Sequence, residues 1–423
     1  MADAPRSKDD GPESPKVCSL PLILAWIATQ RPKMLRRVID WSNVNSYSYN
    51  VAGLEKLGQI VEREFSVLGG VIQWHDLSPA VLIDGRAQPI SKPLGRAMTI
   101  TKRPGAKLRI LLNIHLDTVY PPDSPFQSAG EEAGNVRGPG VADAKGGLAV
   151  MLTALEALER SGTAEGIGWQ VLINPDEEIG SPGSGGLLAA AAKEHHFGLL
   201  FEPALPDGAL VDRRRGSGNF SIVIRGRAAH AGRDFAAGRS AILAAAKISL
   251  QLDSLNRTLP GVTVNVGAID GGAPPNVVPD LAICRINIRT TQLADEQIVA
   301  NAVKNLVSEL NSAEGIRAEL HGQFSSPAKI PDDRTLRLLD AIVSCGKELG
   351  MTVATRSSGG ASDGNRLAAA GLPNIDSLGV RGDLIHTPNE YMIPDSLVER
   401  AQLAALLMLK IAAGDIDPIP FCR

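Results

Sequence analysis

A histidine and an aspartate stand two positions apart at the end of an apolar run, as His115 and Asp117 in LRILLNIHLD (108–117). If this run is a buried strand, both side chains project from the same face, because side chains alternate along a strand. A metal-binding histidine usually donates its second ring N–H to a carboxylate, and this spacing supplies both groups. A core histidine with a satisfied hydrogen bond is the alternative interpretation of the pair.

Asp143 lies in a glycine-rich segment, GPGVADAKGG (138–147), directly before a predicted helix. Glycine and proline can shape a loop that presents this carboxylate at close approach, and its two oxygens could bridge two cations. Aspartate is also a favoured N-cap residue, so capping of the following helix explains it equally well. The segment alone leaves both interpretations open.

Acidic residues also follow two consecutive apolar runs. Glu177 and Glu178 end WQVLINPDEE (169–178), and Glu202 stands in FGLLFEP (197–203). In an open α/β sheet ligands bind at the carboxyl ends of the strands, and neighbouring buried acids repel one another unless they share a cation or a proton. Acids in a solvated turn are the alternative. Two consecutive strands that both end in acids favour a cation site.

His386, in IHTPNE (385–390), offers a second nitrogen ligand near the end of the chain. Nitrogen and oxygen ligands without thiolate suit zinc, with cobalt or manganese as substitutes. One histidine plus carboxylates on each ion, with one carboxylate shared, is the ligand pattern of a two-metal hydrolytic site. In such a site a water becomes acidic, and a further free carboxylate takes its proton and later passes it to the leaving amine.

The elements that must position these residues form two groups. Strands alternate with helices (147–162 and 183–195), which predicts an α/β fold with a mostly parallel sheet. After Gly216 the order becomes β-α-β-β-α-β, the ferredoxin-like arrangement. Its predicted elements are strand 219–227, helix 240–255, strands 262–270 and 281–290, helix 296–311 and strand 316–323. We therefore expect one domain of residues 19–216 and 328–423, interrupted by an inserted domain of residues 217–327, for which the resemblance described below implies a lid or dimerisation role.

Composition sets limits on partners and location. Two domains are the default for 423 residues, and 43 Lys+Arg nearly balance 46 Asp+Glu, so nothing indicates nucleic-acid binding. The 4 cysteines occur singly, which argues against a disulfide framework and favours a cytoplasmic setting over secretion. The apolar run Leu20–Ala28 is too short to span a bilayer. Residues 1–18 are polar and charged, and we predict a disordered tail there.

Taken in chain order, the motifs resemble those of the M20 family of zinc peptidases, most closely its glutamate-carboxypeptidase-like and acetylornithine-deacetylase-like branch. They are HLD (115–117), GPGVADAKGG (138–147), DEE (176–178), FEP (201–203), RAAHAG (227–232) and HTPNE (386–390). The resemblance covers nearly the whole chain, from about residue 22 to residue 413. It implies a zinc-peptidase-like α/β catalytic domain interrupted by an inserted α+β ferredoxin-like lid.

The resemblance also implies two Zn²⁺ ions with Asp143 bridging them. The ligand sets it implies are His115, Asp143 and Glu202 for one ion, and Asp143, Glu178 and His386 for the other. Glu177 would act as the general base and acid, and Asp117 would orient His115.

In the expected lid, His230 resembles the family histidine that stabilises the oxyanion, often from the partner subunit of a dimer. Asn276 and Arg289 match the family's clamp for a substrate carboxylate, and Gly360 falls in its substrate-binding loop. The guanidinium of an arginine suits a carboxylate, although Arg289 taken alone is equally well a surface residue of a strand. Without the resemblance, His230 is best explained as a histidine of a surface loop.

We therefore expect a di-zinc hydrolase of glutamate-carboxypeptidase type that cleaves an amide bond next to a free carboxylate. Within the M20 family that the motifs resemble, a glutamate at position 202, rather than an aspartate, implies the carboxypeptidase and deacylase branches and not the aminopeptidase and dipeptidase branches. The segment VDRRRGS (211–217) does not show the pocket expected for a glutamate side chain, so an N-acyl-amino-acid deacylase, of acetylornithine deacetylase or succinyl-diaminopimelate desuccinylase type, is the alternative. A non-catalytic metal-binding homologue, and a lid that serves mainly in dimerisation, are further alternatives. A small peptide or N-acyl amino acid is the expected substrate and a homodimer through the lid the expected assembly, with no nucleic-acid or membrane partner.

Overall fold

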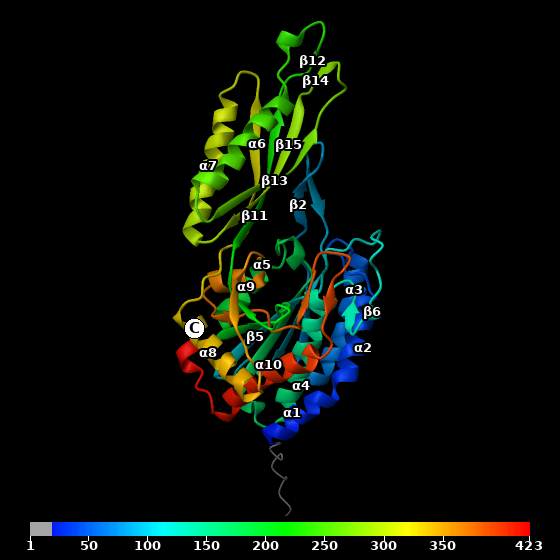
Figure 1. Cartoon of the computed structure of the whole chain (residues 1–423), viewed down its shortest axis with the longest axis vertical. Coiled ribbons are helices and arrows are strands. Elements are labelled where there is room, and N and C mark those ends of the chain that lie inside the picture. Colours follow the sequence, from blue (N-terminus) through cyan, green and yellow to red (C-terminus); the bar gives the residue numbers. More distant parts are fainter. Residues whose placement is uncertain (1–18) are drawn as a thin grey trace, which may run out of the picture.

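The structure of the chain, a computed structural model, describes residues 19–423, so the tail predicted at 1–18 lies outside the described residues. Figure 1 shows two parts joined end to end, a larger one at the bottom built on a six-stranded sheet and a smaller one at the top built on a four-stranded sheet. This arrangement confirms the predicted fold class of an α/β unit interrupted by an α+β insertion.

The larger sheet has the strand order β1-β4-β8-β5-β9-β18. Its strands are β1 (Val71–His75), β4 (Ala97–Lys102), β5 (Leu108–His115), β8 (Ile167–Asn174), β9 (Phe197–Leu200) and β18 (Asn374–Ile375). The pairings from β8 to β18 are parallel, whereas β1 and β4 add to one edge in antiparallel fashion. His115 pairs with Asn174 in this register, so the ends of β5 and β8 lie side by side.

Helices cover both faces of this sheet, which explains why its parallel strands are almost continuously apolar. Side chains alternate: Ile110 and Leu112 of β5 pack in the main core with α4 and α10, while Leu111 packs against α5 and α9. The helices of this part are α1 (Leu20–Thr29), α2 (Arg31–Ser42), α3 (Val51–Phe65), α4 (Gly147–Arg160), α5 (Gly185–Glu194), α8 (Asp333–Glu348), α9 (Asp363–Ala369) and α10 (Ser396–Ala413).

The smaller sheet has the order β13-β15-β11-β16, and all its pairings are antiparallel. Its elements are β11 (Gly216–Arg225), α6 (Ala241–Thr258), β13 (Val262–Gly271), β15 (Leu281–Thr290), α7 (Leu293–Asn311) and β16 (Arg317–Ser326), and their order along the chain is the predicted β-α-β-β-α-β. The two helices cover one face of the sheet through apolar residues such as Ile222, Ile248 and Val303. A short pair, β12 (Ala229–His230) and β14 (Val277–Val278), stands at the tip far from the larger part (Figure 1). We call residues 217–327 the lid. We propose that the two domains have the boundaries predicted from the sequence, with residues 19–216 and 328–423 forming the larger one.

A hairpin that the sequence analysis did not predict covers part of the other face of the lid sheet. Its strands, β2 (Ala80–Ile83) and β3 (Pro89–Lys92), rise from the larger part and reach the lid (Figure 1). Ala87 at its turn packs against Val223 and Ile283, which are both buried. Arg285 of the lid donates to the carbonyl oxygen of Ile83 at 2.9 Å, and Arg225 donates to that of Ala87 at 3.3 Å.

The remaining elements are short. They are the strands β6 (Gly130–Glu132), β7 (Asn135–Arg137), β10 (Leu210–Arg214), β17 (Thr355–Ser358), β19 (Gly382–Asp383) and β20 (Tyr391–Met392), and the helical turns at Ser66–Leu68, Val141–Gly146, Ala164–Gly166, Glu177–Ile179, Phe235–Ala237 and Ile419–Phe421. Among residues 19–423, no helix has the length and apolar character needed to cross a membrane.

The contact between hairpin and lid generates a prediction for Ile283. Replacing Ile283 with Ala removes apolar atoms that are 0% exposed and leaves a cavity beneath the hairpin, so we expect a loss of about 2–5 kcal/mol in the free energy of unfolding. Ile269 lies in the same sheet but is 46% exposed, and Ile269→Ala should change this free energy by about 0.5 kcal/mol or less. Urea unfolding of both variants checks this, and equal effects would contradict the packing described.

Candidate metal centre

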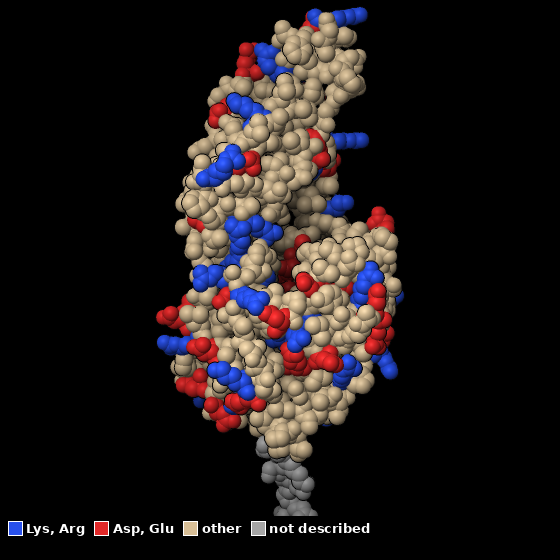
Figure 2. Space-filling view, in the orientation of Figure 1, with Lys and Arg blue, Asp and Glu red and all other residues tan. Residues whose placement is uncertain are grey.

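A cavity of about 430 Å³ lies where the lid meets the larger part. Figure 2 shows this hollow with acidic residues in its depth and basic residues along its lid side. Four of the acidic residues that line it are those predicted as functional: Asp143, Glu177, Glu178 and Glu202. Arg289 and Gly360 line the same cavity, the first from the lid and the second from the loop after β17.

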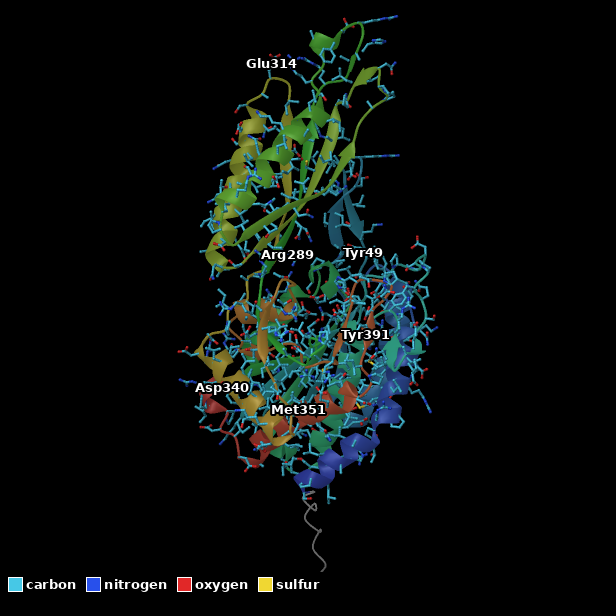
Figure 3. All side chains as sticks on the ribbon, in the orientation of Figure 1. Tyr49, Arg289, Glu314, Asp340, Met351 and Tyr391 are labelled. Carbon is cyan, nitrogen blue, oxygen red and sulfur yellow. The ribbon has the colours of Figure 1, made fainter. Side chains whose placement is uncertain are left out.

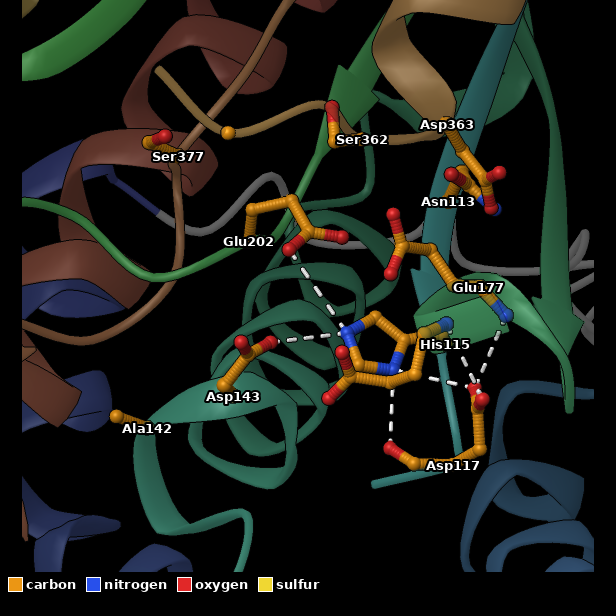
Figure 4. Close-up of polar contacts among 12 residues, drawn as sticks. Asn113, His115, Asp117, Ala142, Asp143, Glu177, Glu202, Ser362, Asp363 and Ser377 are labelled. Atoms are coloured by element: carbon orange, nitrogen blue, oxygen red, sulfur yellow. Dashed lines mark hydrogen bonds and ion pairs between the residues drawn. The ribbon is translucent and has the colours of Figure 1, made fainter. Parts of the chain in front are cut away.

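His115 is buried at the end of β5, and its two ring nitrogens face different groups (Figure 4). Its Nε2 lies 3.0 Å from Oδ1 of Asp143 and 3.8 Å from Oε2 of Glu202. Its Nδ1 lies 3.0 Å from the carbonyl oxygen of Asp117 and 3.4 Å from the carboxylate of that residue. One nitrogen therefore faces the acids, and Asp117 holds the other.

A second group of ligand atoms surrounds the other oxygen of Asp143. Nε2 of His386 lies 3.3 Å from Oδ2 of Asp143 and 3.1 Å from Oε2 of Glu178. Within each of the two sets of three residues, His115–Asp143–Glu202 and Asp143–Glu178–His386, the ligand atoms lie within 4.8 Å of one another. Asp143 directs one carboxylate oxygen to each set. Its alternative role as an N-cap is not seen, because Gly146 precedes α4.

The electrostatics of this cluster are unfavourable without a cation. Burial, together with neighbouring acids, raises the pKa of Glu178 to about 7 and that of Glu202 to about 8, and raises the pKa of Glu177 well above its usual value. Burial would also raise the pKa of Asp143, but hydrogen bonds from His115 and His386 outweigh it and lower this pKa. Two imidazole nitrogens with carboxylates on either side of a shared Asp143 fit a pair of divalent cations, and the donor set contains no sulfur.

Glu177 and Glu178 stand in a tight turn directly after β8, and Asp117 holds this turn. The backbone N–H groups of Glu177 and Glu178 donate to the two carboxylate oxygens of Asp117, each at 3.2 Å. Ser48 also donates to this carboxylate at 2.6 Å. Asp117 therefore does more than contact His115, because it also links that histidine to the turn of Glu177 and Glu178 after the neighbouring strand β8.

The structure brings only part of the predicted lid residues to the cavity. Arg289 follows Ile283, Arg285 and Asn287 on the face of β15 that the two lid helices do not cover, and Figure 3 shows it at the end of the lid nearest the larger part. Its guanidinium donates to the side chain of Asn287 at 2.9 Å. His230 and Asn276 instead lie at the distal tip, where the backbone N–H of Ala231 bonds the carbonyl oxygen of Asn276, and neither lines the cavity.

Sequence reasoning missed Glu390, which is 1% exposed and clamps the loop that carries Asp143. One carboxylate oxygen accepts the backbone N–H groups of Ala142 at 3.0 Å and Asp143 at 3.1 Å, and the other accepts that of Gly140 at 3.1 Å. Tyr120 donates its hydroxyl to the same carboxylate at 2.7 Å. The only sequence signal was the acid at the end of the HTPNE segment.

Arg214 was also missed, although it belongs to the segment that lacked the expected pocket. It lines the cavity and forms a buried bidentate pair with Asp376, at 2.7 and 3.1 Å. A third guanidinium hydrogen bond, of 3.3 Å, goes to the carbonyl oxygen of Gly360. Its charge is therefore already balanced within the protein.

Comparisons with known proteins agree with this geometry. The model of the family described as Peptidase family M20/M25/M40 matches residues 111–410. Carboxypeptidase G2 from Pseudomonas sp. (strain RS-16) is 27% identical over 392 residues, which cover 91% of each chain. Among solved structures, the di-peptidase Dug1p from Saccharomyces cerevisiae superposes with a TM-score of 0.72 at 14% identity, covering 93% of this chain and 99% of that one. The M20 family metallo-carboxypeptidase Sso-CP2 from Sulfolobus solfataricus gives 0.70 at 16% identity, with 91% and 99% covered. The chain therefore belongs to peptidase family M20/M25/M40 and is a metal-dependent hydrolase.

Proposed function

We propose that this hydrolase uses two zinc ions, held by the two ligand sets that share Asp143, to cleave an amide bond next to a free carboxylate. The observation that carries the proposal is that ligands of both sets line, together with Glu177, the same cavity that Arg289 lines from the lid. Cobalt or manganese would serve as substitutes for zinc at such nitrogen and oxygen ligands.

The ions, when bound, would polarise the scissile carbonyl and acidify an attacking water. Glu177 would accept the proton of that water and pass it to the leaving amine, a role that suits a buried carboxylate whose pKa is raised. Arg289 would bind the substrate carboxylate, since its guanidinium has a neutral amide as its side-chain partner and faces the cavity. The loop at Gly360 would form part of the wall of the substrate site.

A carboxypeptidase-like activity is supported by the similarity, along most of the chain, to carboxypeptidase G2. We keep an N-acyl-amino-acid deacylase as the second candidate because of Arg214. This residue is the cation of segment 211–217 that lines the cavity, and it is already paired with Asp376. The glutamate side chain of a substrate would therefore find no unpaired cation from this segment in the cavity.

A panel of substrates separates the two candidates. N-blocked dipeptides and N-acetyl amino acids would be incubated with the protein and added zinc or cobalt, and release of the free amino acid would be measured. Faster cleavage of the dipeptides supports a carboxypeptidase, and faster cleavage of the acetyl compounds supports a deacylase. If no member of the panel is cleaved with either metal, the proposed cleavage next to a free carboxylate is wrong.

We further propose that the protein acts as a homodimer through its lid. Within one chain, His230 and Asn276 stand at the distal tip of the lid and do not line the cavity. If they contribute to catalysis as the resemblance implies, a second copy must bring them to the site. The cytoplasmic location expected from the single cysteines stays a prediction.

Glu177 gives the direct test of the mechanism. Glu177→Gln keeps the shape of the side chain but cannot accept the proton, so turnover should fall by about 10²–10⁴-fold while metal content stays unchanged. Glu178→Gln, on the next residue, should instead weaken metal binding because it removes a proposed ligand. Steady-state kinetics and elemental analysis of both variants check this, and near-normal turnover of Glu177→Gln would exclude the proposed proton transfer.

The clamp formed by Glu390 leads to a prediction about metal affinity. In the variant Glu390→Gln the side chain has a single acceptor oxygen, so it cannot accept from all four donors that now bond the carboxylate, three backbone N–H groups and the hydroxyl of Tyr120. The loop carrying Asp143 should loosen, and zinc affinity should fall by roughly 10–100-fold. Competition with a zinc chelator measures this fall. Glu131→Gln, a change at an exposed acid on β6, is the control and should leave the affinity unaltered.

The dimer predicts that two inactive variants restore each other. Glu177→Gln and His230→Ala would each be purified, unfolded, mixed in equal amounts and refolded together. If His230 acts across the dimer, mixed dimers contain one intact site, and roughly a quarter of the wild-type activity should return. Refolding each variant alone is the control. No recovery in the mixture, with wild-type protein refolding normally, would place His230 in its own chain's site or outside catalysis.

A further inference from the structure

The turn that carries Glu177 is tied together by a carboxylate that the proposed reaction does not use. We call residues 174–181 the acidic turn; it starts at Asn174, the last residue of β8, and ends at Ser181. Asp363, which is 1% exposed, contacts both ends. One oxygen accepts a hydrogen bond of 2.7 Å from the side-chain amide of Asn174, and the other accepts one from the hydroxyl of Ser181.

Other contacts close the acidic turn from the same side. The guanidinium of Arg366, one turn after Asp363 on α9, donates to the carbonyl oxygen of Gly180. Ser181 itself has a φ of 51°, in the left-handed region, so its backbone is held in a conformation that a serine rarely adopts. A hydrogen bond from its side chain to a buried, fixed acceptor opposes relaxation of this backbone.

The segment that supplies Asp363 is also the one that forms the cavity wall. Ser362, directly before it, donates to Asp376 at 2.6 Å, and Asp376 pairs with Arg214. Arg214 in turn donates to the carbonyl oxygen of Gly360. A continuous set of polar contacts thus connects the wall at Gly360 to the acidic turn through the consecutive residues Ser362 and Asp363 and their partners. Figure 4 shows Ser362 and Asp363 on the side of the site where Glu177 lies.

We propose that Asp363 is a positioning residue for Glu177, which it fixes by joining the two ends of the acidic turn. The inference rests on the proposed function of Glu177 as the group that moves the proton. Glu178 would be held by the ion it binds, whereas the carboxylate of Glu177 would depend on the turn for its place. A displacement of about 1 Å in a reacting group costs on the order of 100-fold in rate, so a loosened turn should reduce kcat.

The test compares three variants with one matched control in the full-length protein at saturating zinc. The variants are Asp363→Ala, Asp363→Asn and Ser181→Ala. The control is Glu159→Gln, because Glu159 is also a largely buried acid that accepts from Lys102, Arg103 and Trp169, far from the cavity. An N-benzyloxycarbonyl dipeptide or an N-acetyl amino acid, whichever the wild-type protein cleaves faster, is the substrate.

We expect Asp363→Ala to lower kcat by about 10–100-fold while KM changes by less than about threefold. Asp363→Asn keeps the shape and one acceptor, so it should recover part of the loss, and Ser181→Ala should lower kcat less than Asp363→Ala. Glu159→Gln should lower the melting temperature without lowering kcat. Equal losses of kcat in Asp363→Ala and Glu159→Gln would mean a general structural effect and would overturn the proposal.

Hydrogen exchange gives a readout that needs no substrate. The N–H of Gly180 bonds the carbonyl oxygen of Glu177, and the N–H of Ser181 bonds that of Asp176, both at 2.7 Å. Asp363→Ala should speed exchange in residues 176–185, and Glu159→Gln should not. Unchanged exchange there in Asp363→Ala would overturn the proposal. If the wild-type protein cleaves no substrate, the proposed function of the site fails, yet the exchange result still decides whether Asp363 holds the turn.

Discussion

The constraint on which the rest of the structure depends is the repulsion among carboxylates that the fold brings together at the ends of β5, β8 and β9. Glu178 and Glu202 lie on opposite sides of Asp143, and all three are nearly removed from water. Charges of the same sign in such a place raise one another's pKa unless cations stand between them. Two divalent ions would turn this unfavourable cluster into a stable one, and the shared Asp143 explains how five side chains serve two sets of three.

A cluster under such repulsion keeps its geometry only if the backbone beneath it is rigid. The parallel strands supply the first level of rigidity, since their register puts His115 beside Asn174. Buried carboxylates supply the second, each by accepting N–H groups from one loop: Asp117 holds the acidic turn and Glu390 holds the loop of Asp143. Acids therefore play two roles here. Some face the cavity, and others act as fixed acceptors for the segments that carry them.

The parts of the fold that sequence could predict are those in which local pattern and burial agree. The strand expected at 281–290 is found with those bounds, whereas the helix expected at 296–311 starts at Leu293, because Gln292 and Asp295 form a capping box at its N-terminus. The acids at strand ends were recognisable because chain order placed them at one edge of a sheet. Glu390 and Asp363 were not, since their importance comes from hydrogen-bond donors more than a hundred residues away, backbone N–H groups for Glu390 and side chains for Asp363, which they meet only after folding. For the same reason, nothing in the sequence indicated that His230 and Arg289 lie at opposite ends of the lid.

The hairpin of β2 and β3 has a mechanical consequence for the cavity. The lid is joined to the larger part by the chain itself near Gly216 and Ser326, and it is joined again farther up its sheet, where Ala87 meets Val223 and Ile283. These two separated attachments restrict the rotation of the lid more than the connecting segments alone would. The lid can still rotate about the line that joins the two attachments, and it can move further if the strands of the hairpin bend. The cavity would then open by a sideways tilt of the lid, and the hairpin would limit how wide its entrance becomes.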